Sequence, residues 1–288
     1  MAGLIFNPAP RENHNWHEAI APRYNLPMFP ILLKLGSIEI RTYGVMLLLA
    51  FLFGIWWTGR ELAKKGLQRE KVWDLALWIM IAGVAGARLV YVWEHWAYFS
   101  KNMGEIIAVW HGGLTFYGGL LAVPAALVFF RINRWPFWQT ADIIAPSLAA
   151  GIGIGRWGCF FNGCCYGKPT SLPWGISLPP GTEFGQLFPS QRIHPSPLYE
   201  SLGEWILFFV LIFLVRKRAP YPGFTFLFFV FFSALIRFFN DFTRHYAETA
   251  YVLPPLTFNQ LIAIALMLTA LSFIIYFEIR KRRLSRAS

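Results

Sequence analysis

Five ionisable side chains interrupt apolar stretches of the sequence and are the first candidates for chemistry. They are Arg88, Arg156, Glu200, Arg237 and Asp241. For Arg88, a structural role at the end of its helix is an equal alternative to a functional one. A charge inside a bilayer is costly and is retained mainly when it is paired or faces a polar cavity. Arg237 and Asp241 are four residues apart and share a helical face, so they form either a simple ion pair along one helix or part of a reaction centre.

The segment 151–167 is a candidate binding site for an anion. It reads G-I-G-I-G-R-W-G-C-F-F-N-G-C-C-Y-G and contains Arg156, Asn162 and Gly167. Glycines allow a lipid headgroup or a neighbouring helix to approach the main chain closely. The arginine guanidinium matches phosphate oxygens in a bidentate geometry. The pattern therefore favours a phospholipid headgroup site, and its alternative is a packing face of small residues.

Two further clusters precede apolar stretches. The first, H-G-G-L-T-F-Y-G-G at residues 111–119, places Tyr117 before Gly118 and Gly119. Tyr117 either presents its phenol to a site between helices or belongs to an interfacial aromatic belt. The second, H-P-S-P-L-Y-E, begins at His194 and ends at Glu200. Both residues lie at a helix entrance, where they can instead serve the turn and the helix dipole.

The three cysteines of the chain, Cys159, Cys164 and Cys165, lie within seven residues. This spacing cannot support a disulfide framework across the chain. It also differs from that of structural zinc sites, which usually use four ligands in closely spaced pairs. Small buried thiols are the ordinary interpretation, and soft-metal capture or thiol redox chemistry is the alternative. We expect no metal and no cofactor.

The elements that position these residues are membrane helices. Of the 288 residues, 56% are hydrophobic and 14% are charged, whereas soluble domains average roughly 45–50% and about 25%. The apolar residues form long blocks, which is typical of bilayer-spanning helices. The composition argues against a soluble globular protein and excludes a disordered chain, a disulfide-rich secreted domain and a collagen-like fibre. The net charge of +11 is typical of proteins that bind nucleic acid or an anionic membrane surface. The apolar blocks favour the membrane.

We therefore predict an all-α membrane protein with seven transmembrane helices. An N-terminal extracytoplasmic segment (1–41) precedes the transmembrane catalytic domain (42–278) and a basic cytoplasmic tail (279–288). Residues 1–30 contain no apolar run, so we expect no cleavable signal peptide there. The loops and termini on one side of the predicted spans carry fifteen Lys and Arg, against ten on the other side. Because basic loops are retained in the cytoplasm, the N-terminus is expected outside and the C-terminus inside. The predicted spans are Thr42–Gly59, Leu75–Trp93, Gly112–Phe130, Ile143–Gly155, Ser201–Val215, Ala219–Ile236 and Leu256–Phe277.

In their order along the chain, the motifs resemble those of the phosphatidylglycerol–prolipoprotein diacylglyceryl transferases of bacterial inner membranes. Each motif is weak by itself, and together they are specific. The resemblance extends from about Gly36 to Leu261. The matching pieces are R-T-Y-G (41–44), G-A-R (86–88), G-G-L-T-F-Y-G-G-L (112–120), G-R-W-G-C-F-F-N-G (155–163), H-P-S-P-L-Y-E (194–200), R-F-F-N-D-F (237–242) and L-T-F-N-Q (256–260).

The resemblance implies transfer of the diacylglyceryl group of phosphatidylglycerol to the lipobox cysteine thiol of a preprolipoprotein. It implies phosphatidylglycerol, the lipobox segment and membrane lipids as partners, without nucleic acid, in the bacterial cytoplasmic (inner) membrane. Arg156 and Gly167 are expected to bind the headgroup, and Glu200 to orient it or an arginine. The implied catalytic residues are Tyr43, Tyr117, Arg237 and Asp241, and the implied substrate-binding residues are Arg156, Gly118, Gly119, Asn162, Gly167, His194 and Glu200.

Several positions depart from the pattern of the family. Tyr117 stands where many members carry histidine, and Arg41 stands where a histidine often precedes the motif tyrosine. Cys159 and Cys164 replace a common asparagine and glutamate, and an aspartate at 241 replaces glutamate. The base that activates the thiol is therefore Tyr117 or His194, or else the positive field of the pocket takes its place. The alternatives are a paralogue with a different acceptor, a thiol-redox or metal-handling membrane protein, and a transporter that uses the cysteine cluster.

Overall fold

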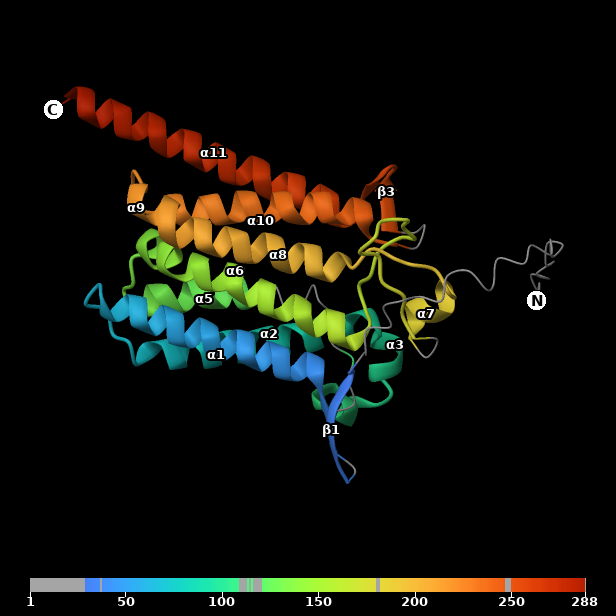
Figure 1. Ribbon diagram of the computed structural model, residues 1–288. Helices are drawn as coiled ribbons and strands as arrows, with labels where there is room; N and C mark the ends of the chain where they lie inside the picture. The colour runs from blue at the N-terminus through green and yellow to red at the C-terminus, as the bar shows by residue number, and fades with distance from the viewer. Residues whose placement is uncertain are drawn as a thin grey trace.

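The computed structural model describes residues 29–36, 38–108, 113, 115, 121–179, 182–246 and 250–287. Its long helices run side by side, and the short strands gather at one end of the bundle (Figure 1). The elements are β1 Ile31–Leu35, β2 Ile38–Arg41, α1 Thr42–Ala63, α2 Lys71–Glu94, α3 Trp96–Phe99, the 3-10 turn η1 Met103–Ile107, α5 Ala122–Ile132, α6 Phe137–Asn162, α7 Glu183–Leu187, α8 Ser196–Val210, the π-helical turn η3 Leu211–Val215, α9 Arg216–Arg218, α10 Phe224–Thr243, β3 Tyr251–Leu253, β4 Leu256–Thr257 and α11 Phe258–Ala287.

Within the described ranges, six helices are long and apolar enough to cross a membrane. They are α1, α2, α6, the continuous helix formed by α8, η3 and α9, α10 and α11. The prediction of a helical membrane protein is confirmed. Two short antiparallel hairpins, β1–β2 and β3–β4, are strands that the all-α expectation did not include. Of the predicted span Gly112–Phe130, the structure describes as helix only the part that belongs to α5, which is an apolar helix of 11 residues. Most of the preceding part lies outside the described residues.

Two of the predicted spans were too short because polar side chains near their ends have partners inside the bundle. The predicted span Ile143–Gly155 is only the middle of α6. At one end of that helix Asp142 accepts a hydrogen bond from the Gly223 N–H at 2.7 Å. At the other end Arg156 forms an ion pair with Glu200. Charged side chains with hydrogen-bond or ion-pair partners do not end a membrane helix, because these partners offset the cost of burying the charge.

The same reason applies to the predicted span Ser201–Val215, which lies within a helix that runs from Ser196 to Arg218. Arg216 forms an ion pair with the buried Glu61 of α1. This contact joins the ends of two spans that are distant in the sequence. The charged residues that marked the predicted ends are therefore part of the helix packing.

The predicted start of the sixth span at Ala219 was wrong. Pro220 and Pro222 lie in the connection before the helix, and α10 begins at Phe224. Proline lacks an N–H group and disfavours helix at the preceding residue. Gly223 has a φ of 99°, a left-handed conformation that favours glycine.

The last helix also differs from its prediction. It begins at Phe258, after the β3–β4 hairpin, and continues through Phe277 to Ala287. The basic residues of the predicted tail are thus a continuation of α11 up to Ala287. Figure 1 shows this end of the helix extending beyond the rest of the bundle.

Helix α6 is the central element of the bundle and packs against α1, α8 and α10. Its spanning segment is 56% buried, whereas that of α11 is 11% buried. Ala145, Ala149 and Ala150 are fully buried in a core cluster with Leu207 and Leu211 of the α8–η3 helix. Small residues let neighbouring helix backbones approach closely inside a membrane. This close packing places residues of α6 and α8 within hydrogen-bonding distance of each other.

The helix α6 also meets α1 closely at Gly158. A Cβ atom at this position would lie 3.1 Å from the Tyr43 ring and 3.4 Å from its Cα atom. At Gly151, two turns earlier, a Cβ atom would meet nothing within 4 Å. The two glycines therefore differ in how much room surrounds them.

We expect Gly158→Leu to lower the stability of the protein by about 1–3 kcal/mol, because overpacking forces the two backbones apart. Thermal unfolding in detergent micelles measures the effect. The matched variant Gly151→Leu is expected to unfold at or above the midpoint of the unmodified protein. Equal midpoints for the two leucine variants would contradict the close contact at Gly158.

Candidate active site

Three charged side chains from three helices meet near one end of the bundle. Arg156 of α6 contacts Glu200 of α8 through Nη2 and Oε1 at 2.6 Å. Arg237 of α10 contacts the other carboxylate oxygen of Glu200 through Nη1 at 3.0 Å. Glu200 is buried, with 3% of its surface exposed. A single carboxylate therefore holds two guanidinium groups that would otherwise repel each other.

Asp241 is the second carboxylate of the site and supports Arg237. The predicted ion pair along the helix is present, with Arg237 Nη2 and Asp241 Oδ1 2.8 Å apart. The Tyr246 hydroxyl also donates to Oδ1 at 2.8 Å, and the Thr257 hydroxyl donates to Oδ2 at 3.0 Å. Both oxygens of this buried carboxylate are thus engaged. Arg237 Nη2 completes the network by donating to the Tyr246 oxygen at 2.7 Å.

Four members of this network, Asn240, Tyr246, Thr257 and Asn259, carry no role in the sequence-based prediction. Asn240 donates to Glu200 Oε2 at 2.9 Å, and Asn259 donates to the Tyr246 oxygen at 3.3 Å. Both asparagines belong to motifs that carry the family resemblance, so the sequence contained a signal that could have identified them. Tyr246 follows α10 without a motif around it. Burial raises the pKa of Tyr246 to about 12, so its hydroxyl stays protonated and continues to donate near neutral pH.

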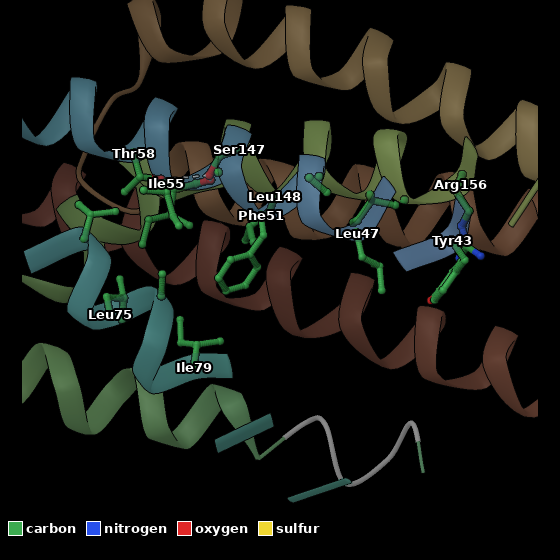
Figure 2. Close-up of a pocket in the computed structure, with 18 of the residues that line it drawn as sticks. Tyr43, Leu47, Phe51, Ile55, Thr58, Leu75, Ile79, Ser147, Leu148 and Arg156 are labelled. Carbon is green, nitrogen blue, oxygen red and sulfur yellow. Dashed lines mark hydrogen bonds between the residues drawn. The ribbon is translucent and has the colours of Figure 1, made fainter. Parts of the chain in front are cut away.

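An apolar cleft between α1, α2 and α6 leads to this charged cluster. Its volume is about 510 Å³. Figure 2 shows Tyr43 and Arg156 at one end and Thr58 and Ser147 at the other. The residues between are almost all hydrophobic, among them Leu47, Phe51, Ile55, Leu75, Ile79 and Leu148. From Tyr43 to Thr58 the cleft follows α1 for roughly 22 Å, at a rise of about 1.5 Å per residue. It is a long apolar channel that has a cation at one end.

The loop after α6 packs against the start of α8. Gly167 is buried, and its N–H group donates to the His194 oxygen at 2.9 Å. A Cβ atom on Gly167 would lie 2.4 Å from the Thr243 oxygen, so a side chain has no room there. His194 Nδ1 lies 3.2 Å from the Tyr199 hydroxyl. Burial and the charge of Lys168 lower the pKa of His194, which favours its neutral form at pH 7.

The sequence-predicted site residues fall into three groups. The charged cluster joins Arg156, Glu200, Arg237 and Asp241, and the cleft places Tyr43 at the same end as Arg156. Asn162 ends α6, and Gly167 and His194 pair in the loop beyond it. Tyr117, Gly118 and Gly119 lie outside the described residues.

The fifth charge within the apolar stretches, Arg88 of α2, serves another part of the structure. It donates to the main-chain oxygens of Glu105, Ile106 and Gly113 at 2.6–3.0 Å. Its guanidinium also lies over the Phe99 ring at 5.2 Å. Arg88 thereby holds the segment that follows α2.

The three cysteines come together at the end of α6. Their sulfur atoms all lie within 4.8 Å of one another. Arg156 Nη1 lies 3.9 Å from the Cys159 sulfur, and Cys159 also lines the cleft. The thiol cluster is thus a direct neighbour of the charged cluster.

Comparisons with known proteins agree on one family. The sequence profile described as prolipoprotein diacylglyceryl transferase matches residues 30–276. A curated relative from Thermosynechococcus vestitus is 37% identical over 193 residues, which cover 66% of this chain and 72% of the relative. A relative from Synechococcus elongatus is 39% identical over 189 residues, which cover 65% of each chain. One from Listeria welshimeri is 32% identical over 253 residues, which cover 87% and 90%. All three are named phosphatidylglycerol–prolipoprotein diacylglyceryl transferase.

We expect Glu200→Gln to destabilise the protein by about 3 kcal/mol, because it removes the ion-pair partner of Arg156 and leaves Arg237 with Asp241 alone. The measurement is the thermal unfolding midpoint in detergent. The matched control is Glu204→Gln, one helical turn further along α8. The buried Glu204 accepts a hydrogen bond from Ser233 at 2.6 Å and has no ion-pair partner among the described residues. An equal loss in both variants would show that the ion pairs of Glu200 do not matter for stability.

Proposed function

The chain belongs to the prolipoprotein diacylglyceryl transferase family, and on this premise we propose that the charged end of the apolar cleft is where phosphatidylglycerol reacts with a prolipoprotein thiol. The activity is the transfer of the diacylglyceryl group from this lipid to the protein, as the names of the relatives state. The observation that carries the proposed site is the position of Arg156. It is the cation at the end of a channel whose other residues are nearly all apolar.

The cleft matches the two chemical parts of a phospholipid. Its hydrophobic length is suited to an acyl chain, since burial of each methylene contributes about 0.8 kcal/mol. Its charged end is suited to the phosphate. Among the described residues Arg156 forms one ion pair, through Nη2. Its remaining N–H groups can therefore donate to phosphate oxygens while Glu200 keeps the side chain in place.

The reaction replaces one bond at the glycerol carbon. The acceptor thiolate attacks this carbon, a C–S bond forms, the C–O bond to phosphate breaks, and the electron pair leaves with glycerol phosphate. Negative charge builds on the departing phosphate. Arg156 and Arg237 are fixed before the reaction by Glu200 and Asp241, and fixed cations in a low-dielectric site stabilise such charge effectively.

The acceptor must react as a thiolate, and the same two guanidinium groups favour that form. We assign the lipobox cysteine of a preprolipoprotein as this acceptor. Asp241 accepts hydrogen bonds on both oxygens, which supports a role in holding Arg237. Tyr43 lines the cleft at the charged end. Tyr117 stays in the proposed catalytic set on the sequence motif, with Gly118 and Gly119 beside the substrate.

We propose seven membrane crossings in the bacterial inner membrane, with the N-terminus outside. The connection from α1 to α2, α9 and the end of α11 lie together at the end of the bundle opposite α3, α7 and β3 (Figure 1). These are the basic connections, so this end is assigned to the cytoplasm. The chain leaves α2 at the outer end and enters α6 from the cytoplasmic end. The segment that ends in α5 therefore supplies the remaining crossing.

Arg156→Lys is expected to lower the rate of diacylglyceryl transfer about a hundredfold or more. Lysine keeps the positive charge but lacks the planar pair of N–H donors that binds two phosphate oxygens at once. The assay mixes the purified protein with phosphatidylglycerol labelled in its acyl chains and a lipobox peptide, and follows label on the peptide cysteine. The control is Arg218→Lys on the exposed basic helix α9, which should retain full transfer.

No label from the unmodified protein, alongside an active reference transferase, would overturn the proposed function. Full activity of the Arg156 variant would leave the transferase in place and remove Arg156 from its site. The two failures are therefore distinguishable.

A second prediction concerns the cleft itself. Gly151 lines it, and a side chain added there points into open space. We expect Gly151→Leu to raise the KM for phosphatidylglycerol several-fold, because the leucine occupies volume that an acyl chain needs, and Gly151→Ala to have a smaller effect. The same labelled-lipid assay at varied lipid concentration measures both variants. An unchanged KM in the stably folded leucine variant would place the acyl chain elsewhere.

A further inference from the structure

The thiol cluster formed by Cys159, Cys164 and Cys165 has the geometry of a metal-ligand set. The three sulfur atoms lie within 4.8 Å of one another. At a Zn–S distance of about 2.3 Å, tetrahedral geometry separates sulfur ligands by roughly 3.8 Å. The thiols therefore need to close by about 1 Å at most to bind one ion. Side-chain rotation of small residues at a helix end can supply this movement.

The backbone at the end of α6 brings the thiols together. Gly163 has a φ of 75° and ends the helix. The Cys164 N–H then donates to the Cys159 oxygen at 3.1 Å, which folds the chain back on the helix end. Cys165 has a φ of 65°, a left-handed conformation that is uncommon for a residue other than glycine.

We propose that Cys159, Cys164 and Cys165 bind one zinc ion as a three-thiolate site at the charged end of the cleft. The linear spacing of these residues left metal binding only as the alternative, because it differs from the closely spaced pairs of four-ligand structural zinc sites. Thiolates are soft ligands that select zinc and other thiophilic metals over magnesium or calcium. Zinc sites with three protein ligands keep a fourth position for an external ligand. This proposal does not depend on the transferase activity, because zinc binding is measured on the thiols themselves.

The surroundings fit the charge of the occupied site. Three thiolates and one Zn²⁺ carry a net charge of −1, and the Arg156 guanidinium lies 3.9 Å from the Cys159 sulfur. Cys159 is buried, whereas Cys164 and Cys165 are partly accessible, so an ion has a route to the cluster. Among the described residues, no histidine, aspartate or glutamate completes the set as a fourth ligand. The fourth position is therefore available to water or to an incoming thiol.

The chain contains three cysteines, so thiol measurements on the full-length protein report on this cluster alone. Protein purified in detergent with a phosphine reductant is treated with Zn²⁺ or left metal-free, and metal content is measured after removal of free ions. We expect about one zinc per chain and at least tenfold slower alkylation of the thiols by iodoacetamide. In a parallel sample Co²⁺ is expected to give the intense sulfur-to-cobalt absorption of thiolate ligation.

Cys164→Ser and Cys165→Ser are each expected to lower zinc affinity at least tenfold, while the thermal unfolding midpoint of the metal-free protein stays within a few degrees. The control His95→Gln, at an exposed histidine distant in the chain, should bind zinc like the unmodified protein. Equal alkylation rates with and without zinc would overturn the proposal. So would absence of thiolate bands with cobalt, or a disulfide within the cluster that forms under air while no metal binds in the reduced protein.

Discussion

The position of Glu200 between two arginines is the interaction on which the site depends. Arg156 and Arg237 come from α6 and α10, and Glu200 comes from α8 between them. Two half-buried guanidinium groups at this separation would repel each other, and each loses part of its hydration. One carboxylate offsets both costs by giving one oxygen to each arginine. The same contact links three helices, so the electrostatic balance and the helix arrangement depend on each other.

The helix packing makes this contact possible. Fully buried alanines of α6 let α8 approach closely, and the Ser201 hydroxyl donates to the Gly153 oxygen at 2.8 Å across the same interface. Asp241 of α10, Tyr246 beyond its end and Thr257 of the hairpin before α11 then fix Arg237. Fixed cations are useful for chemistry because they need no rearrangement when charge develops on a substrate.

The cleft and the charged cluster together form an amphiphilic site inside the protein. The cleft is open between α1, α2 and α6 and has few polar atoms along its length. At its end, a guanidinium group that can bind phosphate lies beside a thiol, because Arg156 and Cys159 are one turn apart on α6. A lipid that reacts at its glycerol carbon needs this combination, because its apolar and ionic parts must be bound at the same time.

The sequence by itself determined the membrane class, the approximate spans and the four charges that form the cluster. Long apolar blocks and the cost of a buried charge are local properties, and they can be read without a structure. Only the tertiary structure decided that Glu200 lies between both arginines, that Tyr246 joins the network, and that adjacent cysteines converge with Cys159. It also corrected the helix ends at Asp142 and Arg216, whose partners are more than eighty residues away in the sequence. Partner choice across helices depends on packing in three dimensions, and periodicity along one helix does not contain that information.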